Sequence, residues 1–208
     1  MSSKPIVIGL AGQKGAGKNY AATILRNHAE SMGYTVAEIA YADPIKEMLK
    51  VGLGLTDEHF ATQEAKETVI PQFGVSPRYL MQTLGTNWGR DLVNNNLWLI
   101  VTGAKIDLSK VDVVLVTDVR FDNEAGQIRG QKQGHIAQII PTISFAYESD
   151  DQHESEQGIH TYGSDFVIPN PKNPEFNRNV ANVFDQILGS YLKKQTVRED
   201  NSHDRVHM

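Results

Sequence analysis

Cysteine is absent from the 208 residues of this sequence. Without it the chain can form neither a disulfide framework nor a thiolate nucleophile, and it is compatible with a reducing compartment. Long apolar runs are also absent, because no stretch approaches the roughly 18 residues that a membrane span requires. The first residues do not follow the basic, apolar and small-residue order of a signal peptide. We therefore expect a cytoplasmic protein with no membrane partner.

Basic residues are also fewer than acidic ones. The sequence has 20 Lys and Arg residues against 25 Asp and Glu residues, which gives a formal net charge of -5. Such a chain has no overall attraction for a nucleic acid backbone or an anionic bilayer, so we expect no nucleic acid polymer as a partner. Any anion must be bound locally. The hydrophobic content of 40% is ordinary for a globular protein, and the length suits one domain.

Near the N-terminus an apolar run leads into a glycine-rich turn. Residues 6–20 read IVIGLAGQKGAGKNY and contain G-x-x-x-x-G-K from Gly12 to Lys18, between a strand-like segment and a helix-like one. Glycines allow the positive φ angles that turn successive N–H groups towards a polyphosphate, and Lys18 would add a charge at the β- and γ-phosphates. The pattern predicts a nucleoside triphosphate site, with a plain glycine turn as the alternative. The residues expected to contact the donor nucleotide are Gly12, Gly15, Ala16, Gly17, Lys18, Asn19 and Tyr20.

One residue of this segment departs from the common motif. Asn19 stands where the motif has a Ser or Thr whose hydroxyl binds Mg²⁺. An amide oxygen can also ligate a hard cation, directly or through water. We therefore keep Asn19 as a candidate magnesium ligand.

Strand-like and helix-like segments alternate along the chain. Strands are predicted at the run starting at Ile6 and at residues 35–40, 111–117, 135–140 and 165–168. Helices are predicted at residues 17–32, from Pro44 onwards, and at 77–84, 97–100, 121–133 and 174–192. This order predicts an α/β fold with a five-stranded parallel sheet, right-handed crossovers and flanking helices.

The same pattern sets the expected domain organisation. We expect a single domain over residues 1–192 and a flexible tail over residues 193–208. Two consecutive helical runs without a strand indicate a helical insertion at about residues 52–106, which we expect to cover a second ligand site. Ligands of such sheets lie at the carboxyl ends of the strands.

Polar residues gather directly after the predicted strand 111–117, at the edge where the glycine-rich turn also lies. Asp118 could organise Mg²⁺ or an acceptor, or cap the next helix. Arg120 could bind a phosphate with two parallel hydrogen bonds. Glu124 could contact a ligand, or pair with Arg120 one helical turn away. We therefore predict Lys18, Asp118 and Arg120 as catalytic residues and Asn19 with Asp118 as the magnesium ligands.

The predicted insertion contains a helix capped by Ser76. Arg78 and Gln82 lie four residues apart on one face of this helix, and Gly85 and Thr86 follow one turn later. An arginine suits a phosphate and a glutamine suits a base edge, because its amide offers a donor and an acceptor together. A solvated helix face is the alternative. Arg78 and Gln82 are therefore predicted to bind the substrate.

Three further residues are candidates for the substrate site or its surroundings. Trp88 and Trp98 could stack on a nucleobase, whereas most tryptophans fill the core. Lys46 lies one turn into a helix that begins at Pro44 and that Asp43 can cap. This position is near the carboxyl end of the strand 35–40, so Lys46 is added to the predicted substrate contacts.

Taken together, these segments resemble a known family. The segments, in chain order, are GxxGAGKN at 12–19, YADPIKEML at 41–49, SPRxLMQTLGT at 76–86, LW at 97–98, DVRFDNEA at 118–125 and HESE at 153–156. They are similar to the deoxynucleoside monophosphate kinases of tailed bacteriophages, a group of P-loop kinases. The resemblance extends from Ile6 to about Asn170.

The resemblance implies an ATP- and Mg²⁺-dependent transfer of a phosphoryl group to a nucleoside monophosphate, in the host cytoplasm if the chain is phage-encoded. The implied acceptor contacts are Arg78, Gln82, Gly85, Thr86, Trp98, Asp118, Arg120 and Glu124. The family often carries Asp and Thr where this chain has Asn19 and Tyr20.

Two other function classes stay open at this point. A P-loop kinase of another small phosphorylated metabolite would keep the phosphate loop without binding a nucleobase. A nucleotide-dependent binding switch would hydrolyse slowly and bind a protein, but no guanine-reading segment is recognisable. The oligomeric state is open too, with a homodimer among the alternatives.

Overall fold

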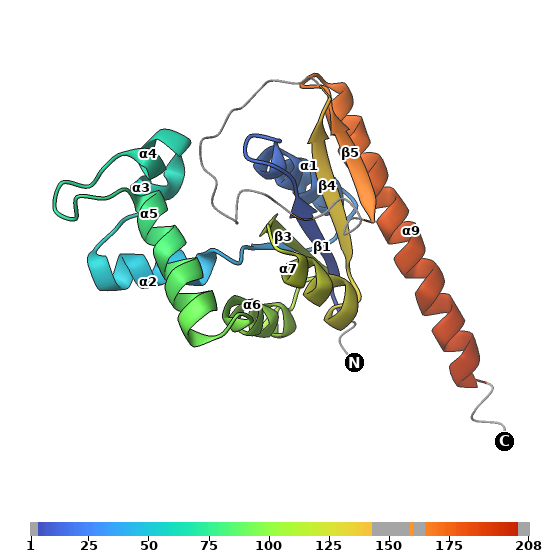
Figure 1. Cartoon of the computed structure of the whole chain (residues 1–208). Coiled ribbons are helices and arrows are strands. Elements are labelled where there is room, and N and C mark those ends of the chain that lie inside the picture. The colour runs from blue at the N-terminus through green and yellow to red at the C-terminus, as the bar shows by residue number, and fades with distance from the viewer. Residues whose placement is uncertain (1–3, 143–158, 160–164, 204–208) are drawn as a thin grey trace. The chain divides into compact units, whose positions relative to one another are not determined.

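The computed structural model describes residues 4–142, 159 and 165–203 (Figure 1). The chain divides into two compact units. Unit 1 consists of Met1–Glu38 and Ser109–Met208, and unit 2 consists of Ile39–Leu108. The insertion predicted at 52–106 thus falls within unit 2, which begins earlier. The single kinase domain over residues 1–192 stays a prediction.

A five-stranded sheet has the strand order β2-β3-β1-β4-β5. The strands are β1 (Ile6–Ala11), β2 (Val36–Ile39), β3 (Val113–Val119), β4 (His135–Pro141) and β5 (Phe166–Asn170). β1 runs parallel to β3 and β4, and β4 runs parallel to β5. The predicted α/β fold with a parallel sheet is therefore confirmed. The helix expected between β4 and β5 falls in residues 143–164, which apart from Ile159 lie outside the described residues.

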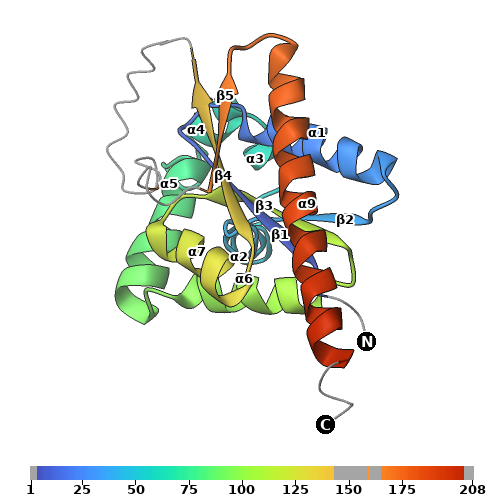
Figure 2. The same ribbon diagram turned by 90° about the vertical axis from the view of Figure 1, so that its right-hand side faces the viewer.

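Two long helices cover one face of the sheet. α1 (Lys18–Ser31) and α9 (Glu175–His203) pack against each other on this face (Figure 2). Ile8 of β1, Leu25 of α1 and Phe184 of α9 are almost completely buried in one core cluster. β1 is buried at every position, as expected of a strand covered on both faces.

The opposite face is covered by α7 (Asp122–Gly126) and its π-helical continuation η2 (Gln127–Gln131). η2 contacts both β1 and β4. A Cβ atom on Gly9 would lie 2.6 Å from Cδ1 of Ile136 and 2.7 Å from Cδ1 of Ile128. The glycine in the centre of β1 therefore allows the close approach of η2 to the sheet.

The C-terminal helix is longer than the sequence predicts. The prediction ended it at Leu192 and assigned 193–208 to a flexible tail, whereas α9 continues to His203. The extra turns contain Lys, Gln, Arg and Glu, which favour a helix without producing the apolar periodicity that marks a packed one. Residues 204–208 lie outside the described residues. Within the described part of the chain, no helix is both long and apolar enough to cross a bilayer.

Unit 2 is built from short helices. They are α2 (Asp43–Leu53), α3 (Glu58–Ala61), α4 (Gln63–Glu67), α5 (Pro77–Gln82), the π-helix η1 (Thr83–Val93) and α6 (Leu97–Leu108). Ser76 caps α5 as predicted, because its hydroxyl accepts a hydrogen bond from the Tyr79 N–H. The cap predicted for α2 was wrong. Ala42 is the N-cap, and Asp43 instead accepts a 2.8 Å hydrogen bond from the Ala40 N–H.

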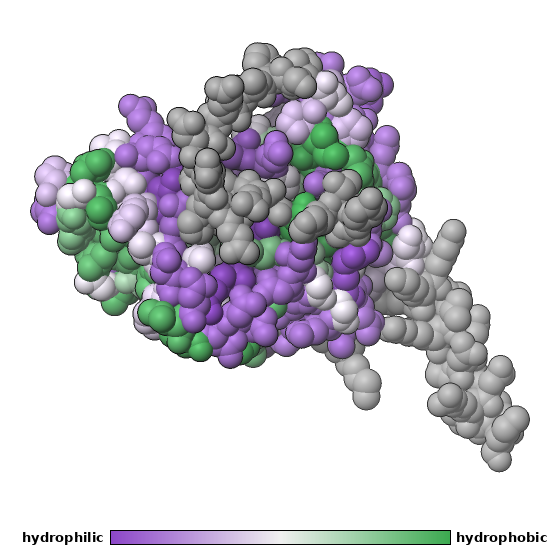
Figure 3. Space-filling model, viewed as in Figure 1, coloured by the Kyte–Doolittle hydropathy of each residue, from purple (hydrophilic) through white to green (hydrophobic). Residues whose placement is uncertain are grey.

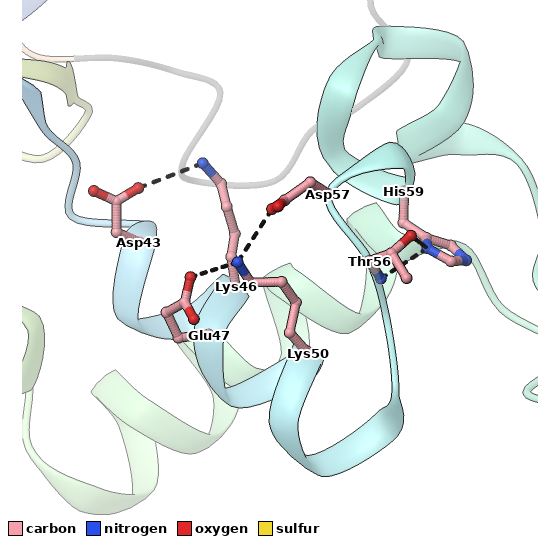
Figure 4. A network of polar contacts seen from close by, with 7 residues as sticks. All are labelled: Asp43, Lys46, Glu47, Lys50, Thr56, Asp57 and His59. Atoms are coloured by element: carbon pink, nitrogen blue, oxygen red, sulfur yellow. Dashed lines mark hydrogen bonds and ion pairs between the residues drawn. The ribbon is translucent and has the colours of Figure 1, made fainter.

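Polar contacts join the end of α2 to the start of α3 (Figure 4). Nζ of Lys50 lies 2.6 Å from Oε1 of Glu47 and 3.1 Å from Oδ1 of Asp57. Hydrogen bonds to these two carboxylates raise the pKa of Lys50 above its ordinary value. The Thr56 N–H donates to Nδ1 of His59 at 3.0 Å. These contacts fix the short connection between the two helices.

The π-helix η1 was not predicted, since the sequence indicated a helix that ends before Gly85. Instead the chain continues in a wide helix that packs against Trp98 of α6. The Trp98 indole N–H donates to the carbonyl oxygen of Gly85 at 2.6 Å, and a Cβ on Gly89 would lie 2.5 Å from the indole ring. Gly89 thus leaves room for the ring, whereas a Cβ on Gly85 would lie 2.9 Å from Cδ1 of Ile45.

Candidate active site

The glycine-rich loop lies between β1 and α1, in the strand, loop and helix order that the motif requires. Gly12, Gly15 and Gly17 have φ angles of 145°, 76° and 102°. A side chain at these angles is strained, and a Cβ on Gly12 would also lie 2.7 Å from the carbonyl oxygen of Ile139. The loop therefore has the backbone conformations that phosphate binding was expected to demand.

Lys18 is the first residue of α1, and its side chain folds back over the loop. Nζ of Lys18 donates to the carbonyl oxygen of Gly12 at 2.6 Å and to that of Gln13 at 3.0 Å. The ammonium group is thus held beside the loop backbone. Its positive charge adds to that of the helix N-terminus at the same point.

Asn19 and Tyr20 are exposed in the first turn of α1. The ring of Tyr20 stacks on that of Phe176 at the start of α9, with centroids 6.1 Å apart and an interplanar angle of 30°. Tyr20 therefore joins the starts of α1 and α9, a role that the sequence did not indicate. Asn19 keeps an exposed amide at the N-terminal end of α1.

The register of the sheet brings Asp118 and Arg120 to the edge where the phosphate loop begins. Ala11, the last residue of β1, pairs with Val119 of β3. Gly12 and Arg120 therefore follow directly after paired residues. Asp118 was expected just after the strand, but it is the penultimate residue of β3. Asp118 and Arg120 are each partly buried.

Glu124 is buried, with 2% of its surface exposed. Its Oε2 accepts hydrogen bonds from the N–H groups of Arg120 at 2.8 Å and Phe121 at 3.1 Å. This carboxylate therefore shapes the turn between β3 and α7. The spacing that suggested an ion pair with Arg120 also lets a glutamate reach back to the backbone at a helix start.

Arg78 projects from the first turn of α5 towards α4. Its Nε donates to Oε1 of Glu67 at 2.5 Å and its Nη2 to Oε1 of Gln63 at 2.6 Å. α4 buries none of its own residues. Val69 and Phe73, the apolar residues that follow α4 in the chain, are exposed too. Figure 3 shows hydrophobic surface at the end of unit 2 that contains α4. Contacts with Arg78 therefore help to hold α4 on α5.

Of the other predicted substrate contacts, Asp118, Arg120 and Glu124 belong to unit 1, and the rest lie in unit 2. Gln82, at the end of α5, and Thr86, on η1, are partly buried. Nζ of Lys46 lies 3.6 Å from Oδ1 of Asp43 on α2. Trp98 is only 3% exposed, and its indole N–H donates to the carbonyl oxygen of Gly85. The geometry therefore favours the core alternative for Trp98. The ring of Trp88 lies 6.4 Å from that of Trp98 between centroids, and Trp88 is 41% exposed.

The predicted site residues thus form two groups. Lys18, Asp118 and Arg120 share one edge of the sheet in unit 1, with Glu124 behind the turn that carries Arg120. The substrate candidates Lys46, Arg78, Gln82, Gly85, Thr86 and Trp98 lie on α2, α5, η1 and α6 of unit 2. Among the described residues, no group of three or more His, Asp or Glu side chains could hold a metal ion. The HESE segment at 153–156 lies outside the described residues.

Sequence reasoning missed two polar residues near the loop. Gln138 of β4 pairs with Ala11, and its Oε1 is buried without a hydrogen-bond partner in the described structure. A lone glutamine in the apolar strand HIAQIIP was the available signal. Asn170, the last residue of β5, donates to the carbonyl oxygen of Ala16 at 2.8 Å. No local pattern could reveal a contact between residues so far apart in the chain.

Comparisons with known proteins bear on this arrangement. A family model described as deoxynucleotide monophosphate kinase matches residues 55–176. A putative deoxynucleotide monophosphate kinase of Acanthamoeba polyphaga mimivirus is 33% identical over 201 residues, covering 88% of this chain and 94% of that protein. A deoxynucleoside-5'-monophosphate kinase of Escherichia phage T5 is 35% identical over 101 residues, covering 46% of this chain and 40% of that protein.

Among solved structures, a gluconokinase from Sinorhizobium meliloti 1021 gives a TM-score of 0.43 at 15% identity, covering 92% of this chain and 98% of that one. That likeness is too weak to carry an argument. The family model and the mimivirus relative do carry one, because the model matches more than half of the chain and the relative is 33% identical over 88% of it. This chain belongs to the deoxynucleotide monophosphate kinase family.

Proposed function

We propose that this chain transfers the γ-phosphoryl group of ATP to a deoxynucleoside monophosphate. An oxygen of the monophosphate attacks the γ-phosphorus, the bond between this phosphorus and the β,γ-bridging oxygen breaks, and the products are ADP and a deoxynucleoside diphosphate. The observation that carries the proposal is the glycine loop with Lys18, in register with Asp118 and Arg120 at one sheet edge. Family membership supports the choice of acceptor.

The residues of unit 1 suit the donor side of this reaction. Backbone N–H groups of the loop and the charge of Lys18 can bind the triphosphate, and Arg120 can neutralise charge on the group in transfer. The carboxylate of Glu124 accepts a hydrogen bond from the backbone N–H of Arg120. This bond fixes the backbone from which the Arg120 side chain projects. Fixed charges cost no reorganisation during the reaction and therefore lower its barrier.

Oxygen ligands for Mg²⁺ are present at the same edge. The carboxylate of Asp118 and the exposed amide of Asn19 would hold the ion, directly or through water, and the unpartnered Oε1 of Gln138 is a further acceptor nearby in sheet register. When bound, Mg²⁺ would neutralise phosphate charge. The oxygen donors therefore fit a hydrated magnesium ion.

Asn19 gives a direct test of the magnesium assignment. Asn19→Asp adds a negative charge beside the metal, so we expect it to lower the Mg²⁺ concentration for half-maximal activity by about threefold to tenfold. Mg²⁺ titrations at fixed ATP compare the two proteins. If Asn19 only shapes the start of α1, the aspartate should raise the melting temperature slightly while the two titration curves superimpose.

Arg78 is the candidate for the acceptor phosphate. Because Glu67 and Gln63 already hold its guanidinium, an incoming phosphate would have to share or displace these contacts. Arg78→Ala should weaken binding of the monophosphate by about tenfold to a hundredfold, since a charged hydrogen bond is lost, and leave ATP binding unchanged. Calorimetry with each nucleotide alone measures both. Equal weakening of the two affinities would contradict the assignment.

An ADP-release screen tests the proposed acceptor class. ADP formation should depend on a deoxynucleoside monophosphate and stay near background with phosphorylated sugars at the same concentration. Turnover with a sugar phosphate alone would favour the other kinase class. Slow ADP release that no acceptor stimulates would favour the binding switch.

A further inference from the structure

Asn170 closes β5 at the carboxyl edge of the sheet and is buried, with 6% of its surface exposed. Its Nδ2 donates to the carbonyl oxygen of Ala16 at 2.8 Å, and its Oδ1 accepts from the Lys172 N–H at 2.8 Å. One side-chain amide thus connects the phosphate loop with the turn between β5 and α9. These partners also fix its orientation, because a carbonyl can only accept and a backbone N–H can only donate.

The contact falls at a buried residue of the loop that has a glycine at positive φ on each side. Ala16 lies between Gly15 and Gly17, both at positive φ, and is 1% exposed. Its own N–H donates to the carbonyl oxygen of Gln13 at 3.1 Å. A Cβ on Gly17 would lie 2.7 Å from Nδ2 of Asn170. The loop and the asparagine are therefore packed against each other at this point.

The direction of one N–H group follows from this hydrogen bond. The carbonyl of Ala16 and the N–H of Gly17 belong to one peptide unit, and in a planar trans peptide they point in opposite directions. Holding the Ala16 oxygen at Asn170 therefore turns the Gly17 N–H away from Asn170. Gly17 immediately precedes α1, so this N–H joins the donors at the helix N-terminus that suit a phosphate.

We propose that Asn170 is a positioning residue, which orients the peptide between Ala16 and Gly17 so that the loop is ready to bind the polyphosphate of a nucleoside triphosphate. The inference rests on the proposed function for its choice of ligand. The stacking of Tyr20 on Phe176 joins α1 to α9 close to the same turn. The turn after β5 thereby acts on the donor site from a distant part of the sequence.

Asn170→Asp is the sharpest variant, because it keeps the shape and the acceptor for the Lys172 N–H but places an oxygen against the Ala16 oxygen. We expect the dissociation constant for ATP and the KM for ATP to rise by about tenfold or more, with the KM for the monophosphate changed by less than about twofold. Calorimetry with ATP and steady-state kinetics measure these values.

Asn179→Asp is the matched control. Nδ2 of Asn179 also donates to a backbone carbonyl at the end of β5, that of Pro169 at 3.0 Å, but this carbonyl belongs to the strand and not to the phosphate loop. The control should leave both KM values within about twofold of the wild type. If the Asn170 variant melts below the assay temperature, Asn170→Ala measured in the cold replaces it, with the same expectation for ATP.

Wild-type affinity for ATP in a folded Asn170 variant, or an equal rise in both KM values, would overturn the inference. The binding measurement also separates it from the proposed function. A wild-type protein that binds ATP but phosphorylates no monophosphate would refute the kinase proposal, while the ATP affinity of the Asn170 variant would still decide the role of Asn170.

Discussion

Replacing Lys18 with alanine should lower kcat/KM for phosphoryl transfer by about a thousandfold or more and leave the fold intact. Lys18 is partly buried beside the loop, where its positive charge would lie against the phosphates and stabilise charge on the transferred group. The variant loses two hydrogen bonds to loop carbonyls, which should cost only about 1 kcal/mol each in stability. Kinetics with saturating acceptor and a thermal melt measure the two effects.

Lys18→Met is the companion variant, because it keeps an unbranched side chain of similar length and removes the charge. It should lose as much activity as Lys18→Ala. Near-wild-type turnover in both folded variants would remove the phosphate loop from the mechanism. A large loss in Lys18→Ala with retained activity in Lys18→Met would attribute the effect to packing of the side chain.

Arg120→Ala should reduce kcat/KM by about a hundredfold or more, mainly through kcat, because a charge aimed at the transferred group acts most strongly in the transition state. The turn between β3 and α7 should keep its structure in this variant, because the hydrogen bond from residue 120 to Glu124 comes from the backbone N–H. Arg120→Lys keeps the charge without the planar fork and should recover only part of the loss.

Arg129→Ala controls for general electrostatic effects. Nη2 of Arg129 lies 2.9 Å from Oδ1 of Asp165, whose Oδ2 accepts from the Ile136 N–H near the start of β4. This is the amino edge of the sheet, opposite the loop. The control should keep kcat/KM within about threefold of the wild type. An equal loss in the Arg120 and Arg129 variants would show that net charge, not a specific contact, matters.

Local patterns in the sequence account for the parts of the fold that depend on neighbouring residues. The loop from Gly12 to Lys18 was predictable because positive φ angles favour glycine. The strand Val113–Val119 was predictable because burial on both faces requires a continuous apolar run. The edge that gathers Asp118 and Arg120 followed from the rule that parallel strands end together.

Other features depend on contacts that the sequence does not display. The sequence alone is as compatible with base stacking by Trp98 as with its burial, and only the hydrogen bond from its indole N–H to the Gly85 carbonyl favours burial. Glu124 could pair with a side chain or with backbone amides at the same spacing. Asn170 reaches a residue 154 positions earlier, so only the assembled sheet brings it to the loop.

Following the γ-phosphate itself tests the central claim most directly. ATP carrying a radioactive γ-phosphate is incubated with the protein, Mg²⁺ and a deoxynucleoside monophosphate, and the products are separated by chromatography. The account predicts that the label moves into the deoxynucleoside diphosphate in step with ADP formation, and that Lys18→Met abolishes the transfer. Label that appears only as free phosphate, or that never leaves ATP with any deoxynucleoside monophosphate, would contradict it.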